Sequence, residues 1–246
     1  MIGSLFNTLL YQPFYNGLVF LISVIPGGDV GVAVIVLTIA VKLGLFSLSY
    51  RSIISQQRLK ELGPELERIK TQFKNDKQRQ AMETMALYRR EGVNPLSTIL
   101  SLLLQIPVVL ALYFVFVKAG LPAINHELLY DFLAEPGVIS LSLLGLIDIS
   151  KKSVILAVLA GATQYLQARL MTPQAPQGEP RDGERSLKDE LARSLQLQMK
   201  YVFPALIGFF AYNFGGAVAL YFAASNAFAI GQEMYVKRAR ERESGK

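Results

Sequence analysis

The 246-residue sequence contains no cysteine, no tryptophan and a single histidine. Without cysteine, the chain can form no disulfide bond and offers no thiolate ligand to a metal ion. The histidine, His126, falls in a predicted loop, which argues against a histidine-based metal or catalytic cluster. The sequence also lacks the glycine pattern that binds nucleotide phosphates and any paired acids within its apolar runs. We therefore expect no metal, no cofactor and no enzymatic activity.

Charge is also scarce over long stretches, and this scarcity sets the class of the protein. Hydrophobic residues make up 52% of the chain, the mean hydropathy is positive, and several runs approach the roughly 20 residues that cross a bilayer. Because a spanning segment must satisfy its own backbone hydrogen bonds, we expect an all-α polytopic membrane protein. The formal charge of +6 fits contact with anionic lipids or RNA.

The apolar runs predict five transmembrane helices, at about residues 30–50, 94–117, 153–170, 199–213 and 216–236. Residues 1–29 are apolar but interrupted by polar side chains, so we expect an extracytoplasmic interfacial helix followed by a turn. A sixth span is the alternative for this segment. The uncharged turn Asn213–Gly216 is so short that the last two spans must run antiparallel.

Residues 51–93 are polar and hold ten Lys/Arg and six Asp/Glu. Apolar residues recur at 3,4 spacing before the turn Asn75-Asp76 and again after it, in the positions Leu59, Leu62, Leu66, Ile69, Phe73 and then Ala81, Met85, Tyr88. Two short helices with such stripes predict an antiparallel coiled-coil hairpin outside the membrane. Gly63-Pro64 should kink the first helix or mark its true start.

The topology follows from the distribution of basic residues. Segments 51–93, 169–200 and 237–246 hold 10, 6 and 5 Lys/Arg, whereas 118–152 holds three and 1–41 none. By the positive-inside rule, the hairpin, the loop at 171–198 and the basic tail at 237–246 should face the cytoplasm. The loop at 118–152 and the N-terminus should lie outside, and the C-terminus inside.

Lys42 is the one formal charge inside the first predicted span. A cation near the middle of a bilayer is penalised by roughly 2.5–3.5 kcal/mol on insertion scales, so it marks a functional site by default. One alternative is that Lys42 snorkels toward Arg51, although nine residues of helix cover about 13 Å. Another is a buried ion pair, although Asp29, Asp148 and Glu233 all lie near predicted helix ends. We favour a hydrophilic groove between the helices.

Other polar side chains inside the spans are candidates to line this groove: Thr38, Gln105, Gln164, Gln167, Ser225, Asn226 and Gln232. Gln164 and Gln167 are three residues apart and therefore share a helix face. For each candidate the simpler alternative is an interhelical hydrogen bond, which contributes about 0.6 kcal/mol in a membrane.

Several short motifs are spread over residues 30–240: Asp76-Lys77-Gln78-Arg79, Met85-Ala86-Leu87-Tyr88, Val93-Asn94-Pro95-Leu96, Gln105-Ile106-Pro107, Ala111-Leu112-Tyr113, Met199, Phe203-Pro204, Leu220-Tyr221-Phe222 and Ser225-Asn226. Taken together they resemble the YidC/Oxa family of membrane protein insertases, in a short form without the large extracytoplasmic domain of some relatives. The resemblance implies five core helices around a hydrophilic groove, open to the cytoplasm and the lipid, and a cytoplasmic helical hairpin. It aligns Lys42 with the groove cation of the family and favours Gln167 as a groove residue.

Three positions depart from that family pattern. Lys42 replaces the usual Arg, Ser47 stands where Pro is common, and Phe214-Gly215-Gly216 replaces a Pro-Ser-Gly turn. Lysine is a compact charge without the planar fork of arginine, so the groove should still attract anions but with less geometric specificity.

The resemblance implies a protein of the cell membrane that inserts nascent membrane proteins without nucleotide hydrolysis. The ribosome, a Sec-type translocon and anionic lipids are further implied partners, with one copy of the chain sufficient. Candidate contacts with the substrate or ribosome lie in the hairpin and tail: Arg68, Lys70, Lys77, Arg79, Lys237 and Arg238. The simpler explanation for these cations is a solvated face that also satisfies the positive-inside rule.

Two other classes of function compete with insertion. A small-solute or ion transporter would also place a charge in the membrane, but no inverted repeat is visible among the spans. A purely structural assembly factor would bind other membrane proteins without using Lys42, so Lys42→Ala would leave its activity unchanged.

Overall fold

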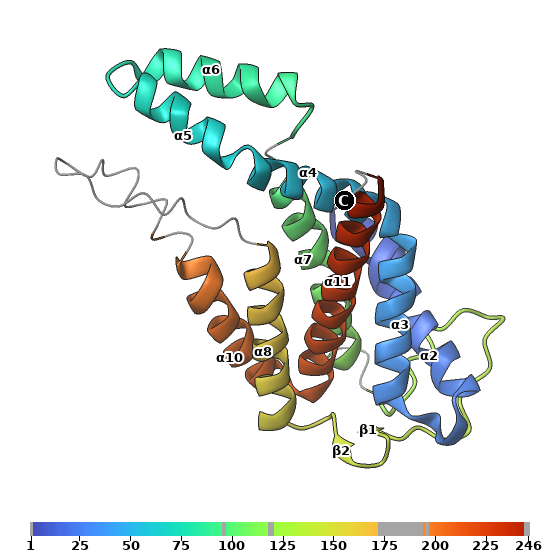
Figure 1. Cartoon of the computed structure of the whole chain (residues 1–246). Coiled ribbons are helices and arrows are strands. Elements are labelled where there is room, and N and C mark those ends of the chain that lie inside the picture. Colours follow the sequence, from blue (N-terminus) through green and yellow to red (C-terminus); the bar gives the residue numbers. More distant parts are fainter. Residues whose placement is uncertain (1, 95–96, 118–120, 172–193, 195–196, 244–246) are drawn as a thin grey trace.

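The computed structural model describes residues 2–94, 97–117, 121–171, 194 and 197–243, and the fold is almost entirely helical (Figure 1). Its helices are α1 (Ile2–Phe6), α2 (Gln12–Val24), α3 (Val30–Gly44), α4 (Phe46–Glu61), α5 (Gly63–Gln72), α6 (Lys77–Arg90), α7 (Ser97–Val117), α8 (Val154–Met171), α10 (Phe203–Phe214) and α11 (Gly216–Glu243). Asn7–Tyr11 and Gln198–Val202 are π-helical turns, Pro26–Gly28 is a 3-10 turn, and β1 (Ser142–Leu143) pairs antiparallel with β2 (Ile147–Asp148). The expected all-α class is confirmed.

Within the described part of the chain, no single helix is both long and apolar enough to cross a bilayer. The consecutive helices α3 and α4, bent by 69° relative to each other, meet that criterion only as a pair. The number of spans and their boundaries stay predictions.

The bundle is built from α3, α7, α8, α10 and α11, with α8 packed against both α10 and α11 (Figure 1). Gly161 of α8 faces Gly208 of α10, and a Cβ added to Gly161 would be in ordinary van der Waals contact with the Gly208 Cα, at 3.6 Å. Small residues at a helix crossing let two backbones approach in this way.

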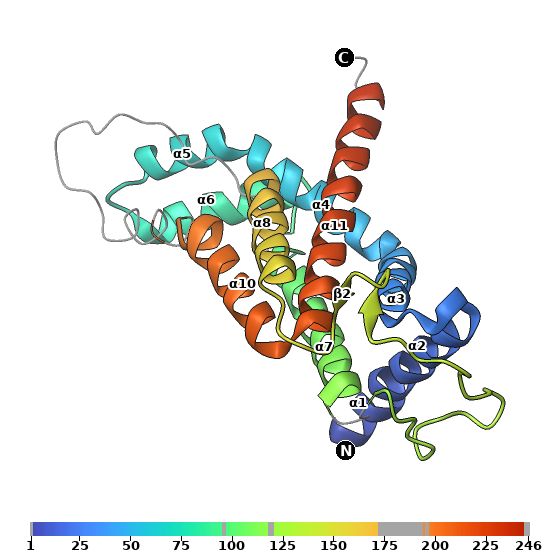
Figure 2. The same ribbon diagram turned by 90° about the horizontal axis from the view of Figure 1, so that it is seen from below.

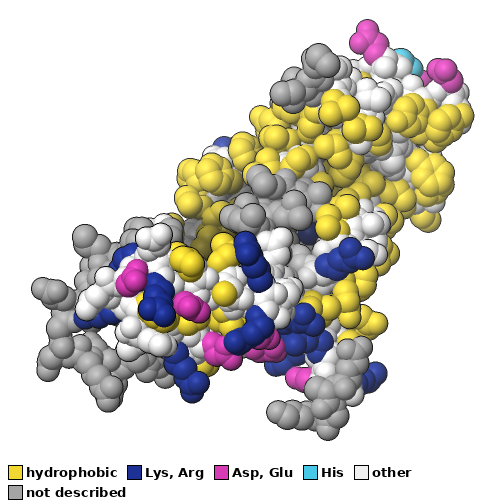
Figure 3. Space-filling view, turned by 90° about the horizontal axis from the view of Figure 1, so that it is seen from above, with side chains coloured by type: hydrophobic (Ala, Val, Ile, Leu, Met, Phe, Trp, Pro, Cys, Tyr) yellow, Lys and Arg dark blue, Asp and Glu magenta, His cyan; other side chains and the backbone are white. Residues whose placement is uncertain are grey.

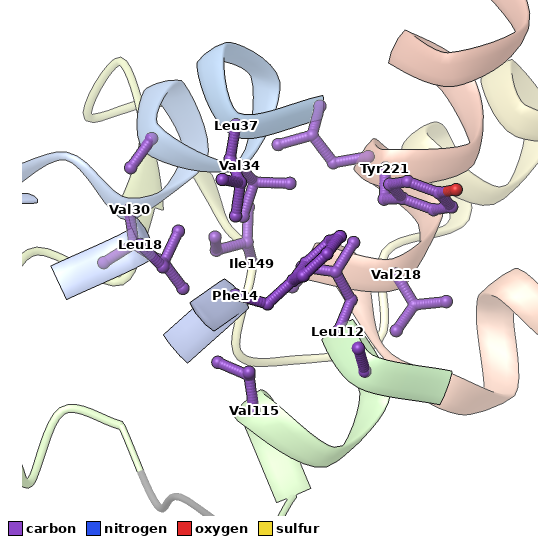
Figure 4. Close-up of a cluster of buried hydrophobic side chains, with 14 of the residues drawn as sticks. Phe14, Leu18, Val30, Val34, Leu37, Leu112, Val115, Ile149, Val218 and Tyr221 are labelled. Carbon is purple, nitrogen blue, oxygen red and sulfur yellow. The ribbon is translucent and has the colours of Figure 1, made fainter. Parts of the chain in front are cut away.

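The core is formed by side chains that come from distant parts of the sequence (Figure 4). Val34 of α3, Leu112 of α7 and Val218 of α11 belong to the same buried cluster as Phe14 and Leu18 of α2. Ile2–Val24 is helical throughout, and its buried face packs against α3 and α7. Asn16 lies on that buried face, where it donates to Leu128 O and accepts from the Tyr130 N–H, each at 2.7 Å. The place of the segment in the membrane stays a prediction.

The stretch expected as one helix over 30–50 is divided in the structure. α3 ends at Gly44, and α4 continues after a bend at Leu45, whose φ of −90° and ψ of 6° interrupt the helix. Glycine is a poor helix former, and beyond it the sequence becomes polar and basic, so the bend separates an apolar helix from an amphipathic one. Lys42 therefore lies in the last turn of α3 rather than in the middle of a straight helix.

A helical hairpin lies within the expected range 51–93 but is shorter: it consists of α5 and α6, because residues 51–61 belong to α4. Pro64 occupies the first turn of α5, so Gly63-Pro64 marks the start of that helix. Leu59, Leu62, Leu66, Ile69 and Tyr88 join one apolar cluster, as the spacing predicted, together with Leu87 and Val93. Phe73 instead lies beneath the Arg79 guanidinium, whose Cζ is 5.1 Å from the centroid of the Phe73 ring.

The predicted stripe on the second helix of the hairpin is wrong at two positions. Ala81 and Met85 are exposed, and the buried residue of α6 is Leu87. Around a helix with 3.6 residues per turn, residue 81 lies about 120° and residue 85 about 160° away from residue 87, so neither shares its buried face.

The two ends of the bundle differ in what covers them. At the end with the α2–α3 turn, the connection from α7 to α8 crosses the bundle as the β1–β2 hairpin (Figure 2). The short antiparallel connection from α10 to α11 is confirmed, with Gly215 at φ 100°. At the opposite end α11 runs on to Glu243, so the basic segment expected as a tail is largely helical. The expected loop at 171–198 lies mostly outside the described residues.

Candidate functional site

Lys42 is half-buried where α3, α7 and α11 meet. Its Nζ donates a hydrogen bond to Gln105 Oε1 of α7 at 3.2 Å. The Gln105 Nε2 in turn donates to the Tyr221 hydroxyl at 2.5 Å and to Ser225 Oγ at 3.2 Å, both on α11. We call these four residues the Lys42 network.

The geometry of this network follows from helix spacing. Tyr221 and Ser225 are four residues apart, so both project from the same face of α11 toward Gln105. Each is only 2% exposed. The carboxamide of Gln105 both accepts and donates hydrogen bonds. It therefore links the ammonium group of Lys42 to the buried hydroxyls of Tyr221 and Ser225.

Sequence analysis identified three of the four residues as groove candidates: Lys42, Gln105 and Ser225. It missed Tyr221, which appeared only inside a motif. The signal that could have found it was its position one helical turn before Ser225. Tyrosine is common in apolar cores, so that spacing alone gave no reason to assign the hydroxyl a partner.

The network contains no carboxylate. Within the described residues the ion pairs do not include Lys42. The acids considered as its partners make other contacts, and Asp148 pairs with Lys151. Asp29 caps α3 by accepting from the Val32 backbone N–H at 2.8 Å, and Glu233 accepts from Gln57 Nε2 at 3.1 Å. The alternative of a buried ion pair therefore finds no support in this part of the chain.

The remaining candidates lie at other places in the bundle. Asn226 is 4% exposed and donates to the Ala160 carbonyl and the Thr163 hydroxyl of α8, each at 3.4 Å. Thr38 donates to Val34 O of its own helix, and Gln232 donates to Phe46 O at 3.5 Å. The contacts of Asn226 and Gln232 are interhelical hydrogen bonds, as in the simpler explanation, whereas that of Thr38 lies within α3. A groove role for these residues stays a prediction. Gln164 and Gln167 are half-buried on α8.

Beyond the end of α3, a second polar cluster fastens α4 to α11 and α8. Arg240 donates to Gln57 Oε1 at 3.1 Å and pairs with Glu61 at 3.2 Å. Lys60 Nζ donates to the Leu170 carbonyl near the end of α8. Burial lowers the pKa of Lys60, and the neighbouring Lys237 charge acts in the same direction, whereas Glu233 opposes the shift.

The six cations proposed to contact substrate or ribosome are all exposed: Arg68, Lys70, Lys77, Arg79, Lys237 and Arg238. Figure 3 shows Lys and Arg side chains gathered over this end of the molecule, whereas much of the remaining surface in view is hydrophobic. Lys70 pairs with Glu67 at 2.7 Å, and Lys77 donates to Gln80 at 3.3 Å. Local contacts of this kind suit a solvated face, so a binding role stays a prediction.

Comparison with known proteins gives consistent matches over most of the chain. The sequence model of the family described as 60Kd inner membrane protein matches residues 21–243. A protein of Clostridium tetani is 31% identical over 92% of this chain and 90% of its own length, and one of Fusobacterium nucleatum is 30% identical over 86% and 87%. A protein of Oleidesulfovibrio alaskensis is 34% identical over 94% of this chain but only 39% of its own length. All three carry the name membrane protein insertase YidC.

Proposed function

Because this chain belongs to the 60Kd inner membrane protein family, the YidC/Oxa family, we propose that it is a membrane protein insertase. Its substrates are nascent membrane proteins, which it transfers into the lipid bilayer without hydrolysing a nucleotide. The chain spans about a third to two fifths of several relatives with this name and nine tenths of another. The proposal therefore concerns the region of sequence that these relatives share with it.

One observation carries the proposal: a half-buried lysine is bonded to a neutral carboxamide, with no carboxylate partner among the described residues. A positive charge left uncompensated in this way attracts anionic groups strongly, since the surrounding helices provide a low dielectric constant. Acidic side chains in the extracytoplasmic tail of a client would be drawn toward Lys42.

The physical difficulty in insertion is dehydration of that polar tail, because polar groups are costly to place in hydrocarbon. In our proposal, α3, α7, α8 and α11 enclose a hydrated groove that reaches partway through the bilayer. The dry distance is shorter still if short spans thin the membrane locally. The apolar part of the client would slide along the lipid-facing surfaces of residues 110–117 and 153–165, where Val154, Ile155 and Val158 are exposed.

The proposed orientation follows the basic residues. The cationic end of the bundle, with α4, α5, α6 and the end of α11, would face the cytoplasm, and the β1–β2 hairpin would face outward. Exposed hairpin and α11 cations would meet the client, the ribosome or anionic lipid headgroups, and one copy of the chain would suffice. A Sec-type translocon is a further proposed partner.

The test is reconstitution of the purified protein into liposomes with a single-span client, without nucleotide. Insertion is scored as a client fragment protected from external protease. We expect protection to depend on the protein and to be unaffected by removal of ATP. Protection equal to that of empty liposomes would contradict the proposal, and solute flux through the same vesicles would favour a transporter.

A further inference from the structure

The connection between α7 and α8 exposes large apolar side chains at the end of the bundle that holds the α2–α3 turn. Leu144 and Leu146, at the turn between β1 and β2, are 68% and 84% exposed. Phe132 and Val138 in the same connection are exposed as well. Single exposed leucines need no explanation, but two at one turn form a local apolar tip.

This tip is held rigidly against the bundle. The Leu144 backbone N–H donates to Asp29 Oδ2 at 2.6 Å, while the other oxygen of the same carboxylate caps α3. The Val30 N–H donates to Ser140 O at 3.0 Å, and the Ser140 N–H donates to Gly28 O at 2.9 Å. The tip thus has a fixed position relative to the start of α3.

The backbone at the tip makes the choice of leucine unusual. Leu144 has a φ of +53° and is followed by Gly145 at +69°. Glycine, asparagine and aspartate are the residues that tolerate this left-handed conformation in tight hairpins. A bulky side chain held there against its own preference motivates a functional explanation.

The apolar surface of the tip continues onto α3. Leu144 and Val32 both line an open hollow of about 450 Å³, together with Ile25 and Pro26 and the polar residues Asp29, Ser140 and Ser142. Val32 begins a row at helical spacing, continued by the exposed residues Val36, Ile39 and Leu43. In the proposed orientation this row faces lipid, so the tip extends a lipid-facing surface beyond the first turn of α3.

A cation completes the pattern. Lys151 lies three residues after Asp148, the last residue of β2. Its side chain is 80% exposed and pairs with the Asp148 carboxylate at 3.0 Å. Lysines beside an apolar surface place their stems along it and their ammonium groups at the level of lipid phosphates.

We propose that the β1–β2 tip is an interfacial anchor that inserts Leu144 and Leu146 between phospholipid headgroups and acyl chains of the extracytoplasmic leaflet. The proposal rests on the membrane orientation given with the proposed function. Its occupant is bilayer lipid, because the tip is continuous with the apolar row of α3 and flanked by Lys151.

The absence of tryptophan provides a direct test. In Leu146→Trp the introduced indole is the only one in the chain, and the residue replaced is exposed, so the fold is preserved. Lys74→Trp, in the turn between α5 and α6, is the matched control for an aqueous position. Both variants are reconstituted into phosphatidylethanolamine–phosphatidylglycerol vesicles, with or without phosphatidylcholine brominated near the headgroup end of its chains.

We expect the emission of Leu146→Trp to lie at shorter wavelength than that of Lys74→Trp, to be quenched by brominated lipid, and to resist a water-soluble quencher. Emission and quenching matching those of Lys74→Trp would overturn the anchor. Short-wavelength emission without quenching by brominated lipid would overturn it as well, because the tip would then contact protein. Because the readout requires no client, it can fail while insertion activity is intact, and it can succeed in a chain that does not insert.

Discussion

Lys42 of α3 and Gln105 of α7 meet side chain to side chain, with 3.2 Å between the ammonium nitrogen and the carboxamide oxygen. This contact lets one neutral residue hold the cation in place without neutralising it. The same carboxamide donates to Tyr221 and Ser225, so the position of Lys42 depends on the packing of three helices.

Replacing Gln105 with Leu should therefore destabilise the bundle. The change leaves Lys42 and the buried Tyr221 hydroxyl without these partners, and hydrogen bonds within membrane bundles contribute about 0.6 kcal/mol each, up to about 1.7. We expect a loss of about 1–2 kcal/mol in reversible unfolding in mixed micelles. Gln164→Leu on α8 is the control, and an equal or larger loss there would show that the network has no special weight.

The helical hairpin offers a pair of neighbouring positions with opposite environments. Leu87 is 4% exposed in the apolar cluster of α5 and α6, whereas Met85 is 50% exposed. Truncating a buried leucine costs about 2–5 kcal/mol, and the low end applies to so small a cluster. Leu87→Ala should speed hydrogen exchange of the α5 and α6 amides, while Met85→Ala should change it little. Faster exchange in Met85→Ala than in Leu87→Ala would contradict this and support the stripe expected from sequence, with Met85 on the buried face.

Arg240 and Glu61 should couple only weakly. The Glu61 side chain is 62% exposed, and exposed ion pairs contribute about 0–1 kcal/mol that salt screens. A double-mutant cycle of Arg240→Ala and Glu61→Ala should give a coupling energy in this range at low salt and less at high salt. A coupling that is large and independent of salt would mean that the pair is shielded from water.

The lowered pKa of Lys60 predicts a pH dependence with a definite sign. Between the folded pKa and the ordinary lysine value near 10.4, the unfolded chain binds more protons than the folded one. Stability should therefore rise with pH in that window, because burial penalises the charged form. Compared with Lys60→Gln, the native protein should gain stability as the pH increases toward 10.4. A relative loss would mean that the contact with the Leu170 carbonyl outweighs desolvation.

The parts of the fold that sequence predicted are those fixed by local pattern. The 3,4 spacing of Leu59, Leu62 and Leu66 identified the apolar stripe of the hairpin cluster, although Leu59 belongs to α4, and Pro64 marked the start of α5. The isolated charge of Lys42 pointed to a polar site, because a cation in an apolar segment is costly unless polar groups or water surround it. Gln105 and Ser225 followed from the same reasoning.

The parts that sequence missed depend on contacts between distant segments. The bend at Leu45 follows Gly44 inside a run that stays mostly apolar to Tyr50, so hydropathy alone could not place it. The choice of Leu87 over Met85 depends on how α6 is rotated against α5. The docking of β1–β2 onto Asp29 joins residues more than a hundred positions apart, which no local pattern reports.

The most direct test of the central claim compares Lys42→Glu with Lys42→Arg in reconstituted liposomes, using a single-span client with an acidic extracytoplasmic tail. Lys42→Arg keeps the positive charge and should retain insertion, whereas Lys42→Glu repels the tail and should abolish it. Both variants should be folded to the same extent by hydrogen exchange before they are compared. Normal insertion by Lys42→Glu would contradict the account, because attraction by the charge at this position could then play no part.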